Sequence, residues 1–460
     1  MTVTPTSGRP VRRSPRFVCA LGTLVAGATL LATAAACQRF EELREAVGIT
    51  AHERYVQQLR ASELDRTALG RDWLAAAESA LARPHEVTLP FAESSYLPPE
   101  EAVAVAYRFD ARRGERLQVE VRVDGADEPL VFIDLYSASD SGPAASRVVS
   151  AEEGERSLRH DVRRDGGFVL RIQPELLRGG RFVITVRTGA SLAFPVSGRD
   201  SRAIRSFWGA DRDGGRRMHQ GVDIFAPRGT AVLAAADGFV SRVSTTSLGG
   251  RVIWMRDLER GQSLYYAHLD SQFVSSGTRV RAGDTLGLVG NTGNARGTQP
   301  HLHFGIYSRG EGAVDPFPFV HEPRIAFPAL AADTTALGRF ARVARDSASL
   351  HISPDPRAPA VARLAQLTAV RLLGASGSWY RVRLPDGAEG WVSARAVESA
   401  TRPIRSTRVA AAAAVRDGPL PIASVVDSVD AGTALPVLGR FADWWLVEAP
   451  SGRLAWLVSN

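Results

Sequence analysis

Short runs of alternating apolar and polar residues constrain this chain most, because a period of two is typical of a strand with one buried face. Such runs are LQVEVRV (117–123), VFIDLY (131–136), FVLRI (168–172) and RFVITVRT (181–188), and turns rich in Gly, Asp and Ser separate them. They predict a small β-sandwich over residues 87–192. No residue in this segment indicates chemistry.

A helical pattern precedes the predicted sandwich. Residues 40–82 are rich in Glu, Arg, Ala and Leu and contain no proline. Four apolar residues recur at a spacing of four, close to one helical turn: Leu69, Trp73, Ala77 and Leu81. We therefore expect a helical spacer over residues 38–86. It is either a rod that holds the following domains away from a membrane or a helical pair packed on its neighbour.

The last part of the chain contains an internal repeat. The segment TAVRLLGASGSWYRVRLPDGAEGWVS from Thr368 aligns without a gap on TALPVLGRFADWWLVEAPSGRLAWLV from Thr433. Both copies keep a Leu-Gly pair, a Pro-x-Gly turn and two tryptophans, which are Trp379 and Trp391 in the first and Trp444 and Trp456 in the second. The pattern resembles bacterial SH3-like domains and predicts two modules, 338–400 and 404–460. The tryptophans serve either as core or as the wall of a ligand groove.

The first 37 residues have the features of an export segment. Four arginines, at positions 9, 12, 13 and 16, precede an uncharged apolar stretch. The following AAAC resembles a bacterial lipoprotein signal, which implies lipidation of Cys37, and Gln38 then resembles sorting to the outer membrane. Simple cleavage and an uncleaved anchor are the alternatives. We expect an exported envelope protein: an outer-membrane lipoprotein that faces the periplasm, or otherwise a membrane-anchored or secreted chain.

The composition excludes several kinds of chemistry. Both cysteines, Cys19 and Cys37, lie in the export segment, so the rest of the chain has no thiol nucleophile and no cysteine ligand for zinc. All 56 basic residues are arginine, which excludes Schiff-base chemistry and the phosphate-loop lysine. The net charge of +7 is spread along the chain without aromatic interleaving, so nucleic acid is not an expected partner.

Histidines concentrate in one part of the chain. Four of the nine lie between residues 219 and 303. In HLHFGIY (301–307), alternation places His301 and His303 on one face of a strand and the intervening apolar residues on the other. One face of this strand therefore belongs to a core, and the other is a candidate site.

An upstream motif supplies further ligand candidates. His219 and Asp223 are four residues apart and can face the same side, with Gly221 allowing the backbone to bend between them. Without cysteine, a zinc site must be built from imidazole and carboxylate. Three such ligands and a water form the usual catalytic arrangement, so a third ligand from a neighbouring strand would complete the set.

Three motifs together carry a family resemblance. The sequences His-x-Gly-x-Asp (219–223), Tyr-Ala-His-Leu (266–269) and His-Leu-His-Phe (301–304) occur in this order. They resemble the lysostaphin-type (LytM-like) zinc endopeptidases of bacterial cell walls, and APRGTAVLAAADGFV and VRAGDTLGLVGNTG are similar to that family as well. We therefore expect a peptidase domain over residues 193–325.

The resemblance also implies roles for individual residues. His219, Asp223 and His303 would hold one Zn²⁺, with His268 and His301 as catalytic histidines beside it. Of these two, one would accept a proton from water and the other would stabilise the oxyanion, and the sequence leaves open which does which. In the family the loops around the metal form a groove for an extended peptide, and three arginines would line it here: Arg212, Arg216 and Arg217.

The expected architecture is mainly β and multidomain: a helical segment, a β-sandwich, a lysostaphin-type peptidase domain and two small SH3-like barrels. The expected function is that of an exported zinc metalloendopeptidase that hydrolyses peptide bonds of peptidoglycan cross-links or stems, in contact with the membrane through its N-terminus. The alternatives are a wall-binding regulator of a separate peptidoglycan hydrolase and an envelope scaffold. All five motif positions hold the expected residue types, which favours the enzyme. Protein partners are not indicated.

Overall fold

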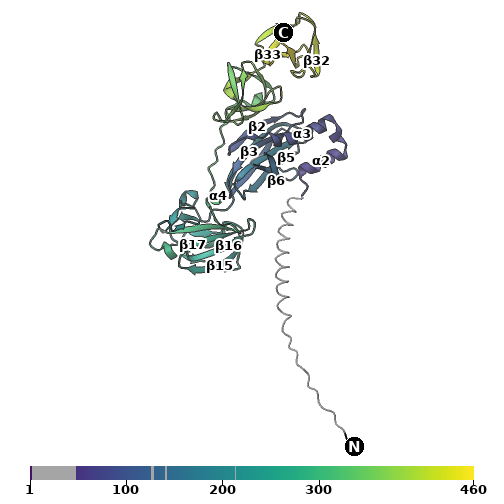
Figure 1. The fold of residues 1–460 in the computed structure, drawn as a ribbon. Helices are drawn as coiled ribbons and strands as arrows, with labels where there is room; N and C mark the ends of the chain where they lie inside the picture. Colours follow the sequence, from purple (N-terminus) through teal and green to yellow (C-terminus); the bar gives the residue numbers. More distant parts are fainter. Residues whose placement is uncertain (3–47, 126–128, 140–141, 213, 460) are drawn as a thin grey trace.

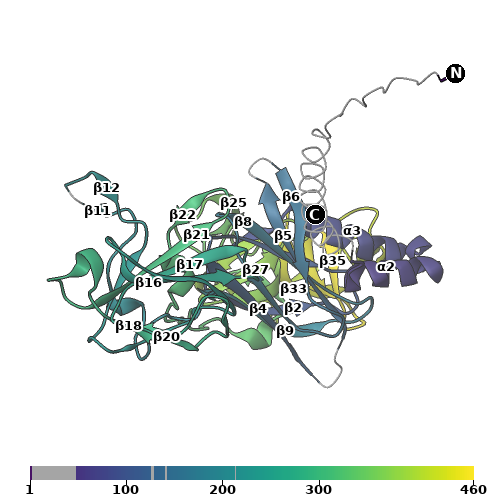
Figure 2. The ribbon, with the colours of Figure 1, turned by 90° about the horizontal axis from the view of Figure 1, so that it is seen from below.

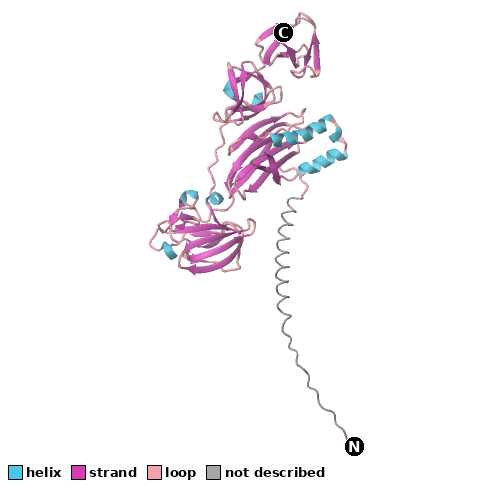
Figure 3. Ribbon diagram, viewed as in Figure 1, coloured by secondary structure: helices cyan, strands magenta, loops and turns pink. Residues whose placement is uncertain are grey.

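The computed structural model describes residues 1–2, 48–125, 129–139, 142–212 and 214–459. These residues form several β-sheets with few helices, which confirms the predicted mainly β, multidomain fold (Figures 1 and 3). Within the described ranges no helix is both long and apolar enough to cross a membrane. Cys37 and the apolar stretch before it lie outside these ranges.

Two helices pack on the sandwich, so the described part of the helical segment is a pair and not a rod (Figure 1). α2 (Ala51–Ala61) begins at a capping box between Thr50 and Glu53, and α3 (Ala68–Ala82) follows the short 3₁₀ helix η1 (Leu64–Arg66). Trp73 of α3 is buried, and its indole N–H donates to the carbonyl of Pro174 at 2.9 Å.

The sandwich consists of two sheets that face each other across one core. The first sheet contains, in order, β1 (His85–Glu86), β3 (Val105–Ala111), β8 (Gly166–Pro174), β5 (Val131–Ser139) and β6 (Gly142–Ser150). The second contains β2 (Phe91–Leu97), β9 (Gly180–Ala190), β4 (Glu115–Asp124) and β7 (Ser157–Asp161). The four runs used to predict the sandwich lie in β4, β5, β8 and β9.

The second sheet does not end at the sandwich. Its edge strand β2 pairs with β26 through Ser94 with Ala375 and Ser95 with Gly374, so the sheet continues into the first C-terminal module. The strands of that module are β25 (Ala360–Ala365), β24 (Ser347–His351), β28 (Glu389–Ser393), β27 (Trp379–Arg383), β26 (Ala369–Ser376), β23 (Phe340–Val343) and β29 (Val397–Ser399). Pairing removes the exposed edge that β2 would otherwise present.

A buried ion pair lies under this shared sheet. The Arg381 guanidinium donates to the Glu93 carboxylate at 2.9 Å and to Ser95 Oγ at 2.9 Å, and the two charged side chains are 3 % and 0 % exposed. Gly374 is required beside them, because a Cβ there would lie 2.1 Å from Glu93 Oε1. The charges thus fix how the module sits on the sandwich.

The second module repeats the strand order of the first, as the sequence repeat predicts. Its strands are β30 (Arg405–Arg408), β33 (Ala434–Phe441), β34 (Trp444–Glu448), β35 (Leu454–Val458), β31 (Ala413–Arg416) and β32 (Val425–Val429). Trp391 and Trp456, which occupy the same position in the two repeats, each pack against the domain that precedes their module. Trp391 is buried in the sandwich core, whereas Trp456 packs edge-on against Phe340 of the first module at 6.2 Å. Both tryptophans therefore fill junctions with the preceding domain.

The segment expected to form the peptidase domain, residues 193–325, is built on a large sheet over a core of its own. In order, its strands are β10 (Ile204–Ser206), β13 (Val222–Phe225), β21 (His301–Ser308), β17 (Gln262–Leu269), β16 (Gly250–Asp257), β15 (Gly238–Thr246) and β19 (Arg279–Val280), with β22 (Gly312–Val314) beside β21. A small sheet contains β14 (Ala231–Leu233), β20 (Thr285–Leu288) and β18 (Ser271–Gln272). This domain also contains η2 (Ser201–Ala203), η3 (Gly293–Ala295) and α4 (Phe317–Val320), whereas η4 (Thr334–Ala336) and η5 (Ala394–Ala396) belong to the first C-terminal module.

Ionic and apolar contacts hold this domain against the sandwich. Arg260 donates to Asp161 at 2.5 Å, and Arg116 of the sandwich donates to the same carboxylate at 2.6 Å. Phe319 of α4 packs on Gly114, where a Cβ would lie 2.4 Å from the ring. The domains therefore meet at a defined surface, and the hairpin of β11 (Asp211–Arg212) and β12 (Arg217–Met218) stands out on the far side (Figure 2).

The buried ion pair gives a test of the shared sheet. We expect Arg381→Met to lower the free energy of unfolding by about 3–5 kcal/mol, because it leaves the Glu93 carboxylate buried without a counter-charge. The double variant Glu93→Met/Arg381→Met should be less destabilised than the sum of the two single variants, as measured by urea unfolding. Arg66→Met, which removes an exposed pair with Glu63, is the control and should change stability by less than about 1 kcal/mol. Additive effects at positions 93 and 381 would contradict this role.

Candidate metal centre

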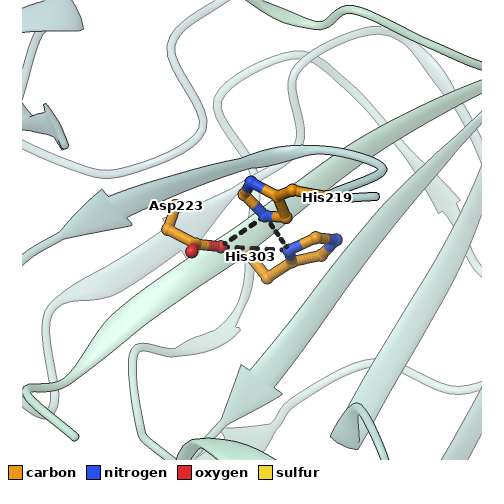
Figure 4. A group of neighbouring side chains, drawn as sticks. All are labelled: His219, Asp223 and His303. Atoms are coloured by element: carbon orange, nitrogen blue, oxygen red, sulfur yellow. Dashed lines mark hydrogen bonds and ion pairs between the residues drawn. The ribbon is translucent and has the colours of Figure 1, made fainter. Parts of the chain in front are cut away.

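The pairing of two strands brings the predicted ligands together (Figure 4). β13 and β21 are antiparallel neighbours in which Asp223 lies directly opposite His303. His219 lies just before β13, on the segment that leaves the β11–β12 hairpin. The alternation of β21 sends Leu302 and Phe304 into the core, so His303 emerges on the opposite face.

Three atoms of these side chains form a nearly equilateral triangle. His219 Nε2 and Asp223 Oδ1 are 3.0 Å apart, His219 Nε2 and His303 Nδ1 are 3.0 Å apart, and His303 Nδ1 and Asp223 Oδ1 are also 3.0 Å apart. Ligand atoms about 2 Å from a zinc ion have a similar mutual spacing. Two imidazoles and a carboxylate are also a donor set that zinc prefers, so these residues fit a zinc ion.

A glycine makes room for this cluster. A Cβ on Gly221 would lie 2.7 Å from His303 Nε2 and 2.6 Å from the carbonyl oxygen of Phe304. Any side chain at this position would displace the imidazole or the strand. Glycine is therefore required at position 221 because the backbone there lies close to His303 and Phe304. The sequence alone suggests only that this glycine lets the backbone bend.

Hydrogen bonds orient two of the three ligands. The Nδ1–H of His219 donates to the Phe207 carbonyl oxygen at 2.8 Å, so Nε2 is the ring nitrogen that faces Asp223 and His303. Arg212 Nη2 donates to Asp223 Oδ2 at 2.7 Å and to Ser206 Oγ at 2.7 Å. This contact leaves Oδ1 as the carboxylate oxygen that faces the histidines. Such outer contacts commonly set ligand orientation at metal sites.

The carboxylate of the cluster is ionised. Burial by itself would raise the pKa of Asp223, but hydrogen bonds from His219 and His303 outweigh burial and hold this pKa far below its usual value. Burial lowers the pKa of His303, which favours its neutral form. An anionic carboxylate and neutral imidazoles are the protonation states that ligate a divalent cation.

Two further histidines flank the cluster. The ring of His268 lies 5.1 Å from that of His301 and 5.9 Å from that of His303. His268 Nδ1 donates to the Thr292 carbonyl at 2.9 Å, and His301 Nδ1 donates to the Gln299 carbonyl at 2.8 Å. In the neutral form of either ring, Nε2 is then the nitrogen that can accept a proton, as a general base must.

The backbone of His268 is strained. Its φ is +62°, in the left-handed region that residues other than glycine rarely adopt. Its amide donates to the Gly249 carbonyl at 2.8 Å, which helps to hold this conformation. Burial, followed by the charges of His301 and His303, lowers the pKa of His268 to about 4, so its imidazole is neutral near pH 7. Strain of this kind concentrates at functional sites.

The three arginines predicted to line a peptide groove lie on or beside the β11–β12 hairpin. Arg212, expected in a peptide groove, contacts the outer oxygen of Asp223, whereas Arg216 and Arg217 are exposed on the β11–β12 hairpin. The sequence did not indicate the orienting carbonyls of Phe207, Thr292 and Gln299, because a backbone carbonyl carries no residue-type signal. The Arg212 side chain could have been noted as a partner of Asp223 from their opposite charges alone.

Comparison with known families identifies two segments. The model of peptidase family M23 matches residues 217–316, and that of the bacterial SH3 domain matches residues 346–398. The first segment contains all three predicted ligands and both flanking histidines. The second contains most of the first C-terminal module.

Relatives of known name match the same part of the chain. The L-Ala–D-Glu endopeptidase of Bacillus subtilis is 37 % identical over 137 residues, which are 27 % of this chain and 42 % of that protein. Peptidoglycan DD-endopeptidase ShyC of Vibrio cholerae is 35 % identical over 116 residues, 24 % of this chain and 26 % of that protein. The chain thus spans less than half the length of these curated relatives.

A solved structure is also similar. The catalytic domain of the antimicrobial peptidase lysostaphin from Staphylococcus simulans is 32 % identical, and the match covers 25 % of this chain and 90 % of that domain, with a TM-score of 0.24. The family models and the sequence relatives confirm the resemblance to lysostaphin-type peptidases. Residues 217–316 belong to a peptidase family M23 domain, and residues 346–398 belong to a bacterial SH3 domain.

Proposed function

We propose that the protein is an exported zinc metalloendopeptidase that hydrolyses peptide bonds in peptidoglycan cross-links or stems. The observation that carries this proposal is the triangle of His219, Asp223 and His303 atoms, with two further histidines beside it. In the proposal, residues 193–325 form the catalytic domain, and His219, Asp223 and His303 hold one zinc ion.

The chain's own groups would divide the catalytic work. Zinc, when bound, supplies a Lewis acid that makes water more acidic and polarises the scissile carbonyl. The Nε2 atoms of His268 and His301 are free of backbone partners and face this region. One would accept the proton of the attacking water and then donate that same proton to the leaving amine, and the other would stabilise the developing oxyanion by a hydrogen bond from a protonated Nε2.

The relatives support peptidoglycan as the substrate. One is named an L-Ala–D-Glu endopeptidase and another a peptidoglycan DD-endopeptidase, and the part of each that matches this chain contains the candidate site. The SH3 modules would position the catalytic domain on the wall. Lipidation at Cys37 would hold the protein at the outer membrane, facing the periplasm.

A direct test uses purified protein and isolated peptidoglycan. We expect new amino groups and shortened cross-links in the released fragments, identified by mass spectrometry. A chelator should abolish this release, and added Zn²⁺ should restore it, because the three ligands alone cannot activate water. Release that is insensitive to chelator would contradict the metalloenzyme proposal, and a complete lack of release would contradict the substrate.

The two histidines of β21 should have separable effects. We expect His303→Ala to lower bound zinc from about one ion per chain to nearly none and to stop cleavage, because it removes a ligand. His301→Ala should keep the zinc and lower kcat by about 10²- to 10⁴-fold, as expected for the loss of an acid–base group. Zinc is measured by atomic absorption and kcat with a cross-linked peptide dimer. His351→Ala, in the first SH3 module, is the matched control. Full zinc content in His303→Ala would contradict the ligand assignment.

Arg212 should act through Asp223 and not through the substrate. We expect Arg212→Ala to weaken zinc binding by about 10- to 100-fold, because Asp223 loses the contact that orients its outer oxygen. Competition with a fluorescent chelator measures this affinity. Arg281→Ala removes an exposed arginine of the same domain and should leave it unchanged. If Arg212→Ala raised KM and left zinc affinity intact, the residue would belong to the substrate groove.

A further inference from the structure

A cleft separates the sandwich from the peptidase domain. Its volume is about 780 Å³, which is within the range of small-molecule sites. The sandwich contributes the turn between β7 and β8, and the peptidase domain contributes the turns after β16 and β21. The cleft lies at the opposite end of β21 from His303, five residues or roughly 16 Å along the strand. It is therefore distinct from the metal centre.

Arginines from both domains line this cleft. They are Arg113, Arg163 and Arg164 of the sandwich and Arg260 and Arg309 of the peptidase domain. Two of them are held by acidic neighbours, since Arg260 pairs with Asp161 and Arg113 pairs with Glu311. The third acidic side chain, Asp165, accepts from the backbone amide of Arg113 at 2.7 Å.

The other three arginines lack such partners. Arg163, Arg164 and Arg309 are exposed, and among the described residues no hydrogen bond or ion pair engages their guanidinium groups. The charges of Arg163 and Arg164 nevertheless affect titratable groups that line the cleft. Burial lowers the pKa of His160, and the charge of Arg163 lowers it further, while Arg113 and then Arg164 lower the pKa of Glu311.

An isolated exposed arginine would mean little in a chain that uses arginine for all its positive charge. Here, however, three arginines without ion-pair partners among the described residues, contributed by two domains, line the same cleft. The two other arginines of the cleft, Arg113 and Arg260, already form ion pairs. The five arginines of the cleft outnumber its three carboxylates, which are Asp161, Asp165 and Glu311, so the cleft keeps an excess of positive charge that a bound anion would neutralise. Guanidinium groups bind carboxylate and phosphate oxygens in a two-pronged manner.

We propose that this cleft binds a small multivalent anion that carries carboxylate or phosphate groups. Arg163 and Arg164 hold it from the sandwich, and Arg309 holds it from the peptidase domain. Because the ligand bridges both domains, its binding strengthens their contact and raises the unfolding temperature of the full chain. Neither zinc nor peptide cleavage is required for this binding.

The test is calorimetric titration of the full chain at physiological ionic strength. The probes are tricarballylate, which carries three carboxylates, and pyrophosphate, which carries phosphate groups. Both are titrated into the His303→Ala variant, so that chelation of zinc makes no contribution. We expect saturable binding of at least one probe and a higher unfolding temperature in its presence. Preference for one probe then identifies which anion chemistry the cleft recognises.

Matched double variants make the result specific. Arg163→Ala/Arg309→Ala should weaken binding at least tenfold, and without ligand it should unfold at the same or a higher temperature, because repulsion is relieved. Arg279→Ala/Arg281→Ala removes two exposed arginines that do not line the cleft and should bind as before. The proposal is overturned if neither probe binds at 10 mM or if both double variants weaken binding equally.

Discussion

The pairing of β13 with β21 is the constraint on which the candidate site depends. It places Asp223 opposite His303 while Leu302 and Phe304 remain in the core. A shift of the β13–β21 register by one residue would turn His303 towards the core and expose Leu302 to solvent. Exposing the core side chains is unfavourable, and this cost maintains the geometry of the site. The apolar residues behind the candidate metal centre thus keep Asp223 and His303 in position. Gly221 allows the segment that carries His219 to approach His303 closely enough to complete the cluster.

A second constraint acts between domains. The sandwich and the first SH3 module share one sheet, and the Glu93–Arg381 pair is buried beneath the seam. The second module uses the same repeat positions against the first: Gly439, like Gly374, lies against the preceding domain, and Trp456, like Trp391, fills the junction. Because ion pairs and Phe319 also hold the peptidase domain on the sandwich, the four units are packed together and are not joined by linkers alone.

Much of this could be predicted from the sequence, because its signals are local. Alternation predicted the sandwich strands, the spacing of Trp73 and Ala77 predicted a helix, and the three motifs pointed to five residues that the structure brings close together. The shared sheet could not be predicted, since strand β2 (FAESSYL) lacks an apolar–polar alternation and its partner lies far along the chain. Glu93 in that strand would be assigned to solvent from sequence alone. The orientation of the histidines was equally hidden, because it depends on backbone carbonyls such as that of Thr292.

The sheet that runs from β9 through β2 into β26 also limits how the first SH3 module can move relative to the sandwich. A module on a flexible linker searches a volume, and the local concentration of its partner falls steadily as the linker lengthens. A module joined through backbone hydrogen bonds has no such freedom, so its distance and direction from the candidate metal centre are fixed. Adding or removing one repeat would therefore change the distance from the end of the chain to that centre by one defined step.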